Sequence, residues 1–191
     1  MSAVTGISDH IGWAECVTIR WTDAGPAIVE RRREELIDAG VPSAPYHHEG
    51  LALPIDEVQP LLARTRASVT AQCRRVVQRL RDELGVTAVV LQESPFPALP
   101  ASLADVLVSY ALTCAADGML YREELATQAA SAGLTVHRTA RRTDPVAIAA
   151  TVAGVTAAQV TAWLDAFGRE VGAPWRKEHR TAAASALAVF G

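Results

Sequence analysis

The chain has 191 residues and a formal net charge of −3, with half of its residues apolar and 20% charged. This composition is typical of a globular protein and predicts one domain over residues 1–191. No apolar run approaches the ~20 residues needed to cross a bilayer, and no secretory signal is evident at the N-terminus, so no membrane association is expected. Three widely spaced cysteines, Cys16, Cys73 and Cys114, predict free thiols in a reducing cytoplasm.

The first half of the chain predicts three short strands, a long loop and a long helix. The loop covers residues 38–54, where three prolines and two glycines exclude a regular element. Apolar side chains recur at helical spacing over residues 55–84, and Gly85 is placed to end that helix. Turn residues separate three apolar, β-branched stretches, which indicates an antiparallel meander. The strands of this meander are expected at residues 4–8, 13–20 and 27–37.

The second half alternates strands with helices. Residues 86–91 are an unbroken apolar run, typical of a strand that is buried on both faces. A helix is expected from Ser102 to residue 116, and Asp117-Gly118 is expected to separate it from a second helix. Asp144-Pro145 and the Thr156–Gln159 capping box each predict a helix start. The remaining elements are expected at residues 119–132 (helix), 134–139 (strand) and 176–190 (helix).

This order predicts an α/β fold with one mixed sheet. A three-strand antiparallel meander is followed by strands that alternate with helices, which makes the later strands parallel. Helices are therefore expected on both faces of the sheet.

The element order, with an Asp at the first strand turn, resembles the RNase H-like fold, and short motifs resemble Holliday junction resolvases of the RuvC type. Gly6-Ile7-Ser8-Asp9 stands where that family has Gly-Ile-Asp, and residues 89–93 resemble its strand that ends in Glu. Further similar segments are residues 132–139, 156–160 and 184–188. The resemblance implies a nuclease that binds nucleic acid and uses Mg²⁺ or Mn²⁺.

The chain departs from the family pattern at two places. Ser8 separates Ile7 from Asp9, and one residue along a strand moves a side chain to the other face. The two Asp positions of the family's final helix correspond to Ala182 and Ser185. Glu178, one helical turn earlier, and its neighbour His179 are the nearest substitutes.

The resemblance places a candidate metal site at Asp9, Glu93, Glu178 and His179. Three converging carboxylates would hold two hard divalent ions that activate water for phosphodiester cleavage. A catalytically degenerate relative that binds nucleic acid without cutting it is the other interpretation of the same pattern. The structural alternative is a turn residue at Asp9, an exposed strand end at Glu93 and a first-turn helix acid at Glu178.

A second candidate site combines His10 with the loop residues Tyr46, His47, His48 and Glu49. Imidazoles and a carboxylate suit a transition metal, or His48 would act as a general base. Tyr121 and Arg122 are candidates because a helix start there would bring them near the strand ends. The alternatives are an exposed polar loop and the ordinary first turns of a helix.

The arginines of the long helix fall on both flanks of its apolar stripe, which favours solvated side chains over a phosphate track. They are Arg64, Arg75 and Arg79 on one flank and Arg66, Arg74 and Arg81 on the other. A local basic patch of Arg31–Arg33 and Arg138 with Arg141 and Arg142 stays open. Two other functions also stay open: a non-enzymatic cytoplasmic homodimer that binds a protein or small ligand, and a metal enzyme built on the His10 and Tyr46–Glu49 set.

Overall fold

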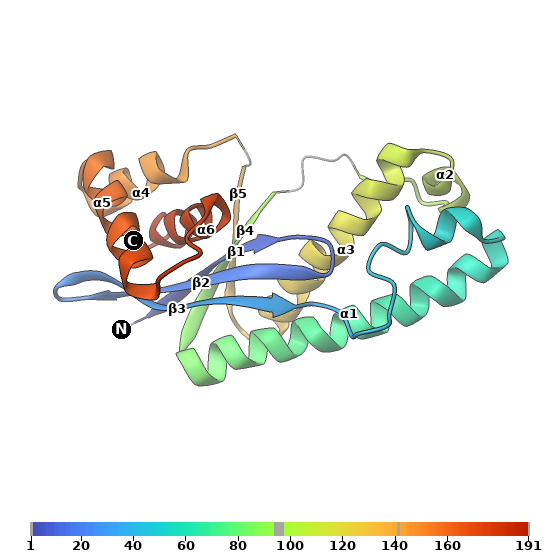
Figure 1. The fold of residues 1–191 in the computed structure, drawn as a ribbon, viewed down its shortest axis with the longest axis horizontal. Helices are drawn as coiled ribbons and strands as arrows, with labels where there is room; N and C mark the ends of the chain where they lie inside the picture. Colours follow the sequence, from blue (N-terminus) through green and yellow to red (C-terminus); the bar gives the residue numbers. More distant parts are fainter. Residues whose placement is uncertain (1, 94–97, 141, 191) are drawn as a thin grey trace.

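Five strands form one mixed sheet in the computed structural model, which describes residues 2–93, 98–140 and 142–190 (Figure 1). The strands are β1 (Ala3–Asp9), β2 (Trp13–Thr22), β3 (Gly25–Glu35), β4 (Val86–Gln92) and β5 (Thr135–Thr139). They lie in the order β3-β2-β1-β4-β5. The first three pair antiparallel, whereas β4 pairs parallel with both β1 and β5. The predicted meander followed by parallel strands is confirmed.

Helices cover both faces of the sheet, as predicted. One face packs against α1 (Ile55–Leu84) and α3 (Tyr110–Ser131), and these two helices project beyond the strands toward α2 (Leu103–Leu107) (Figure 1). The other face packs against α4 (Pro145–Ala153), α5 (Ala157–Val171) and α6 (Lys177–Leu187). A single 3₁₀ turn, η1 (Glu49–Ala52), interrupts the loop before α1. Among the described helices none alone could span a membrane; α4 and α5 meet the length and composition test only together, and they bend by 107° at their junction.

The central strands divide their side chains between two cores. Ala3 and Ile7 of β1 lie in the core beneath α1 and α3, whereas Val4 lies in the core beneath α6. The same alternation places Val89 and Leu91 of β4 on the α1 side and Val90 on the α6 side. This is the side-chain period of two expected of strands that are covered on both faces.

Most predicted helix boundaries are confirmed, but the break at Asp117-Gly118 is wrong. The long helix covers the predicted residues and ends at Gly85, whose φ of 65° is the left-handed conformation that glycine adopts without strain. The break between α2 and α3 lies instead at Ser109, whose hydroxyl accepts a hydrogen bond from the backbone N–H of Leu112 (3.4 Å). Asp117 stays helical because its buried carboxylate has tertiary partners, which offset its low helix propensity.

The expectation of solvated arginines along α1 is wrong for Arg79. Its guanidinium lies 2.8 Å from a carboxylate oxygen of Glu30 and 2.6 Å from one of Glu34, and only 12% of its side chain is exposed. These neighbours raise the pKa of Arg79 against the opposing effect of burial. The strand β3 therefore supplies two acidic partners to a helix arginine, the buried Glu34 and the partly buried Glu30.

Candidate functional site

A polar cavity of about 460 Å³ lies where β1 ends, between α3 and the start of α6. We call it the Ser8 cavity. β1 contributes Ser8 and Asp9, the turn after it contributes His10, and β4 contributes Gln92. The other lining residues are Arg122, Thr143, Pro145, Lys177, Glu178 and Thr181. Asp9, His10, Arg122 and Glu178 were expected from the sequence as site residues, although the sequence assigned them to different sites.

The register of β1 decides which side chain faces α6. The strand continues to Asp9, with Ser8 opposite Glu15 and Asp9 opposite Ala14 of β2. Gly6 faces α6, because a Cβ added there would overlap the backbone of Ala182. Ser8, two residues on, therefore lies on the α6 side, and Asp9 lies on the α3 side. The strand does not end at Ser8. The extra residue between Ile7 and Asp9 therefore places Asp9 on the opposite face from Ser8.

Asp9 forms a two-point ion pair with Arg122 of α3. The guanidinium Nε and Nη2 donate to the two carboxylate oxygens at 3.1 and 2.7 Å. Only 4% of the Asp9 side chain and 10% of the Arg122 side chain are exposed. A carboxylate that is satisfied at both oxygens by a buried guanidinium is a poor ligand for a metal ion, because binding the metal would leave the arginine buried without a partner.

Glu93 lies outside the cavity. It is exposed beyond the end of β4, and its backbone N–H donates to the carbonyl of Thr139 at 2.8 Å. The neighbouring Gln92 lines the cavity because it shares a face with Val90, which packs beneath α6. Sequence reasoning missed Gln92, although strict alternation along β4 would have found it.

The two α6 candidates point to different partners. Glu178 lines the Ser8 cavity, whereas His179 is buried. The His179 Nδ1 accepts the backbone N–H of Arg176 at 2.9 Å, and its Nε2 lies 3.2 Å from a carboxylate oxygen of Glu15. Sequence reasoning missed this contact with Glu15 because it joins residues far apart in the chain.

A second cavity of about 380 Å³ adjoins the first across Glu178. The Arg33 guanidinium stacks on the Trp13 ring at 4.0 Å and pairs with Glu35 at 3.0 Å. Arg31 donates to the backbone carbonyls of Gly172 and Pro174. Basic side chains dominate this surface, which carries Arg31, Arg33, Arg176 and Lys177 and is called the basic rim below.

The predicted metal ligands do not form a set that fits Mg²⁺ or Mn²⁺. Asp9 is paired with Arg122, Glu93 is outside the cavity and His179 faces Glu15. Glu178 remains the one candidate acid in the Ser8 cavity without an ion pair among the described residues. Within the described residues, no three His, Cys, Asp or Glu side chains are grouped so that they could hold a metal ion.

The second predicted constellation is divided between two places. The His10 ring stacks on Trp13 at the Ser8 cavity, with 4.0 Å between ring centroids and 9° between planes. Its buried Nε2 has no hydrogen-bond partner in the described part of the chain. The Tyr46–Glu49 loop instead packs on α3, where the backbone N–H groups of Tyr46 and His47 each donate to Asp117 at 3.0 Å.

Of the two histidines in that loop, His47 is the one whose ring contacts a buried partner. Its Nδ1 lies 2.8 Å from the Asp117 carboxylate, and His48 and Glu49 are exposed. Burial raises the pKa of the Asp117 carboxyl, and the hydrogen bonds from Tyr46 and His47 oppose this shift. The loop histidine is thereby an anchor that joins the loop to α3.

Tyr121 is part of the core and does not belong to the cavity. Its side chain is fully buried, and its hydroxyl donates to the carbonyl of Ser43 at 2.6 Å. Burial also raises the pKa of this phenol. The expected helix start near Tyr121 is absent because α3 begins eleven residues earlier, at Tyr110, so only Arg122 of this pair reaches a strand end.

The strand order, the mixed pairing and the helices on both faces define an RNase H-like α/β fold. Solved structures of RuvC from Thermus thermophilus are similar to this chain. One has a TM-score of 0.53 at 14% identity and covers 97% of this chain and 92% of its own. Another, in complex with a Holliday junction substrate, has a TM-score of 0.51 at 15% identity, with coverages of 98% and 92%. No protein-family model and no curated protein matches the sequence.

Proposed function

We propose that this protein is a catalytically degenerate relative of the RuvC-type resolvases that binds nucleic acid beside the Ser8 cavity and does not cleave it. The proposal rests on which residues at the ends of β1 and β4 face α6. The strand-end side chains that face α6 are Ser8 and Gln92, whereas Asp9 and Glu93, the acids that the resemblance implies, each lie one residue further along the chain. Asp9 lies on the opposite face, neutralised by Arg122. Function is therefore assigned from the site, with the fold as supporting analogy.

Basic side chains outnumber acidic ones around the two cavities, with Glu178 among the acids, and this balance supports a polyanionic ligand. The Asp9–Arg122 pair is neutral, and Glu15 is engaged by His179. Arg176 and Lys177 of the basic rim are exposed and have no carboxylate within 4 Å in the described residues. Local basic clusters of this kind bind phosphates even where the whole chain is acidic.

The unpartnered His10 Nε2 also favours a ligand here. Buried polar atoms are almost always hydrogen-bonded, so an unsatisfied nitrogen at a cavity wall points to a missing partner. A sugar hydroxyl or phosphate oxygen that enters the Ser8 cavity would supply this partner. The proposed contact requires no Mg²⁺ or Mn²⁺, and no group of metal-binding side chains occurs in the part of the chain that the structure describes.

Fluorescence anisotropy with labelled four-way junction and linear duplex DNA tests the proposal. We expect binding in EDTA, unchanged by added Mg²⁺ or Mn²⁺, that weakens steeply with salt because counterions are released. Reversing both exposed charges, Arg176→Glu with Lys177→Glu, is expected to weaken binding by at least ~10-fold. New acids at a helix N-terminus favour the helix, so α6 should fold in this variant.

The matched control is Arg74→Glu with Arg75→Glu, an adjacent exposed pair on α1, which packs on the opposite face of the sheet. Its affinity should equal that of the wild type. Manganese-stimulated strand cleavage that disappears in Glu178→Gln would overturn the degenerate assignment and restore the metal nuclease. Equal losses of DNA affinity in the two charge-reversal variants would show that the binding site is not at α6.

Cytoplasmic location and homodimerisation belong to the same proposal. Three free cysteines in the structure support a reducing compartment. Sedimentation equilibrium with and without junction DNA would establish whether the chain is a dimer.

A further inference from the structure

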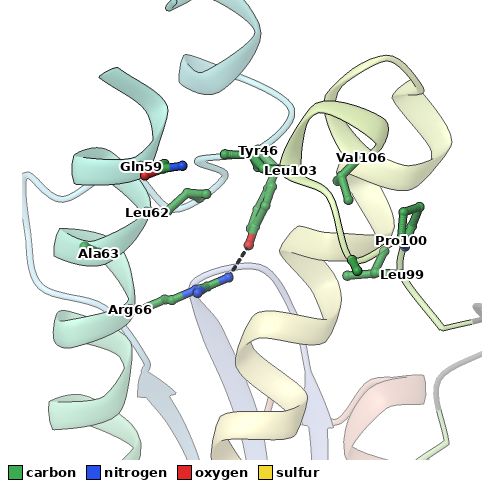
Figure 2. Close-up of a pocket in the computed structure, with 10 residues that line it drawn as sticks. Tyr46, Gln59, Leu62, Ala63, Arg66, Leu99, Pro100, Leu103 and Val106 are labelled. Carbon is green, nitrogen blue, oxygen red and sulfur yellow. Dashed lines mark hydrogen bonds between the residues drawn. The ribbon is translucent and has the colours of Figure 1, made fainter. Parts of the chain in front are cut away.

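A separate cavity of about 440 Å³ lies between the N-terminal half of α1 and the segment that leads into α2 (Figure 2). This size is within the usual range for small-molecule sites. Tyr46 stands between the two walls, and its ring crosses from the loop toward Arg66 of α1. None of the residues that line this cavity lines the Ser8 cavity.

Most of the residues that line this cavity have apolar side chains. Leu62 of α1 and Val106 of α2 are buried, and Leu99 and Leu103 pack against them. These side chains belong to a small core that is separate from the two cores at the sheet. This small core has five buried residues, and the cavity lies beside them. An apolar surface that faces an unfilled cavity favours an apolar ligand, because such a ligand removes that surface from water.

Two polar groups converge at one end of the cavity. The Arg66 Nη2 donates to the Tyr46 hydroxyl oxygen at 2.6 Å. Because the phenol accepts this bond, its own proton is free to be donated elsewhere. The Tyr46 backbone N–H donates a hydrogen bond to the Asp117 carboxylate at 3.0 Å. This bond anchors the loop backbone from which the ring extends. The remaining guanidinium protons and the phenol proton are thus donors at the same place.

The charged side chain that lines this end of the cavity is Arg66. No acidic residue lines the cavity, and Arg66 has no carboxylate within 4 Å among the described residues. Glu123 and Glu124 line a neighbouring cavity with Arg66, but Glu123 pairs with Arg138 at 2.7 Å and Glu124 accepts from Gln128 at 2.7 Å. An anion is therefore the complementary ligand group, since it would be bound by charge-assisted hydrogen bonds.

We propose that this cavity binds a small alkyl carboxylate. The carboxylate accepts hydrogen bonds from Arg66 and Tyr46, and the alkyl chain lies against Leu62, Leu103 and Val106. The site is independent of the proposed nucleic-acid function.

Methyl NMR titration with octanoate tests the site through the resonances of Leu62 and Leu103. We expect saturable shifts with octanoate, and at least ~10-fold weaker binding of octanol and octylammonium, because only the acid carries the matching charge. Arg66→Gln should weaken octanoate binding by at least ~10-fold, and Tyr46→Phe by about 5-fold through loss of one neutral donor.

The control is Arg74→Gln, an exposed arginine two turns along the same helix that donates to Gln128 and does not line the cavity. It should bind octanoate like the wild type, and unchanged Val4 and Ile19 methyl resonances report that each variant is folded. Equal binding of octanol, or full octanoate affinity in Arg66→Gln, would overturn the proposal. Tighter binding of N-acetyl-leucyl-leucine than of octanoate would assign the site to a peptide terminus and overturn the alkyl ligand.

Discussion

At the scale of single residues, the Asp9–Arg122 pair ties the end of β1 to the middle of α3. Both side chains are almost fully buried, and both carboxylate oxygens accept a hydrogen bond. A buried ion pair gains little net stability because desolvation offsets the attraction, but removing one partner leaves an uncompensated buried charge. The carboxylate that most resembles a catalytic acid in the sequence is thus a structural group.

We predict that Arg122→Met lowers the free energy of unfolding by about 3 kcal/mol, because Asp9 remains buried without its partner. Asp9→Asn combined with Arg122→Met should recover much of this loss, since the pair is removed together. Urea denaturation of both single variants and the double variant forms the thermodynamic cycle. Additive losses in the double variant would show that the two side chains do not act as a pair.

At the scale of elements, the close approach of α6 to β1 explains why the final helix is rich in alanine. Gly6 leaves no side chain between the strand and the Ala182 backbone. The buried face of α6 consists mainly of small residues, including Ala183 and Ala186, with the larger His179 and Leu187 at its two ends. Ala182 and Ser185, where the resemblance expects acids, are both buried, so larger acidic side chains would need space that this packing does not leave.

Two glycine substitutions test this view in opposite directions. Gly6→Ala should lower the free energy of unfolding by about 3 kcal/mol, because its Cβ overlaps the Ala182 backbone and α6 must move. Gly118→Ala should raise it by ~0.5–1 kcal/mol, because that glycine lies inside α3 with open space around its Cα. Thermal unfolding of both variants measures the difference, and a stable Gly6→Ala would contradict the tight contact.

At the scale of the whole molecule, α1 and α3 continue past the sheet and form a separate small core with α2 (Figure 1). This core has five buried residues, whereas the one between α1, α3 and the sheet has eighteen. Fewer buried contacts and an unfilled cavity should lower the local free energy of opening. The lobe with the proposed carboxylate site is therefore expected to be the less stable part of the fold.

Hydrogen exchange measures this difference directly. We predict that amides around Leu62 and Val106 exchange at least ~10-fold faster than those around Val76 and Leu125 in the main core. Saturating octanoate should slow exchange in the lobe alone, because a ligand stabilises the state that binds it. Equal protection of both regions in the free protein would show that they unfold as one unit.

The sequence alone determined the order and type of the elements. Helical periodicity, the terminal Gly85 and the Asp144 and Thr156 caps are local signals, and they correctly placed α1, α4 and α5. Alternating and continuous apolar runs identified the strands of the mixed sheet. The break expected at Asp117 was wrong because a tertiary contact with the Tyr46 loop overrode a local propensity.

The composition of the site was decided by tertiary structure. The sequence could show that Ser8 separates Ile7 from Asp9, but only the pairing of β1 with β2 established that the strand continues through both residues. That register directs Ser8 toward α6 and Asp9 toward Arg122, a partner 113 residues away. Alternation along β4 likewise directs Gln92, and not Glu93, toward the Ser8 cavity. Local signals determine where strands lie, whereas the neighbours across the sheet determine which face each side chain meets.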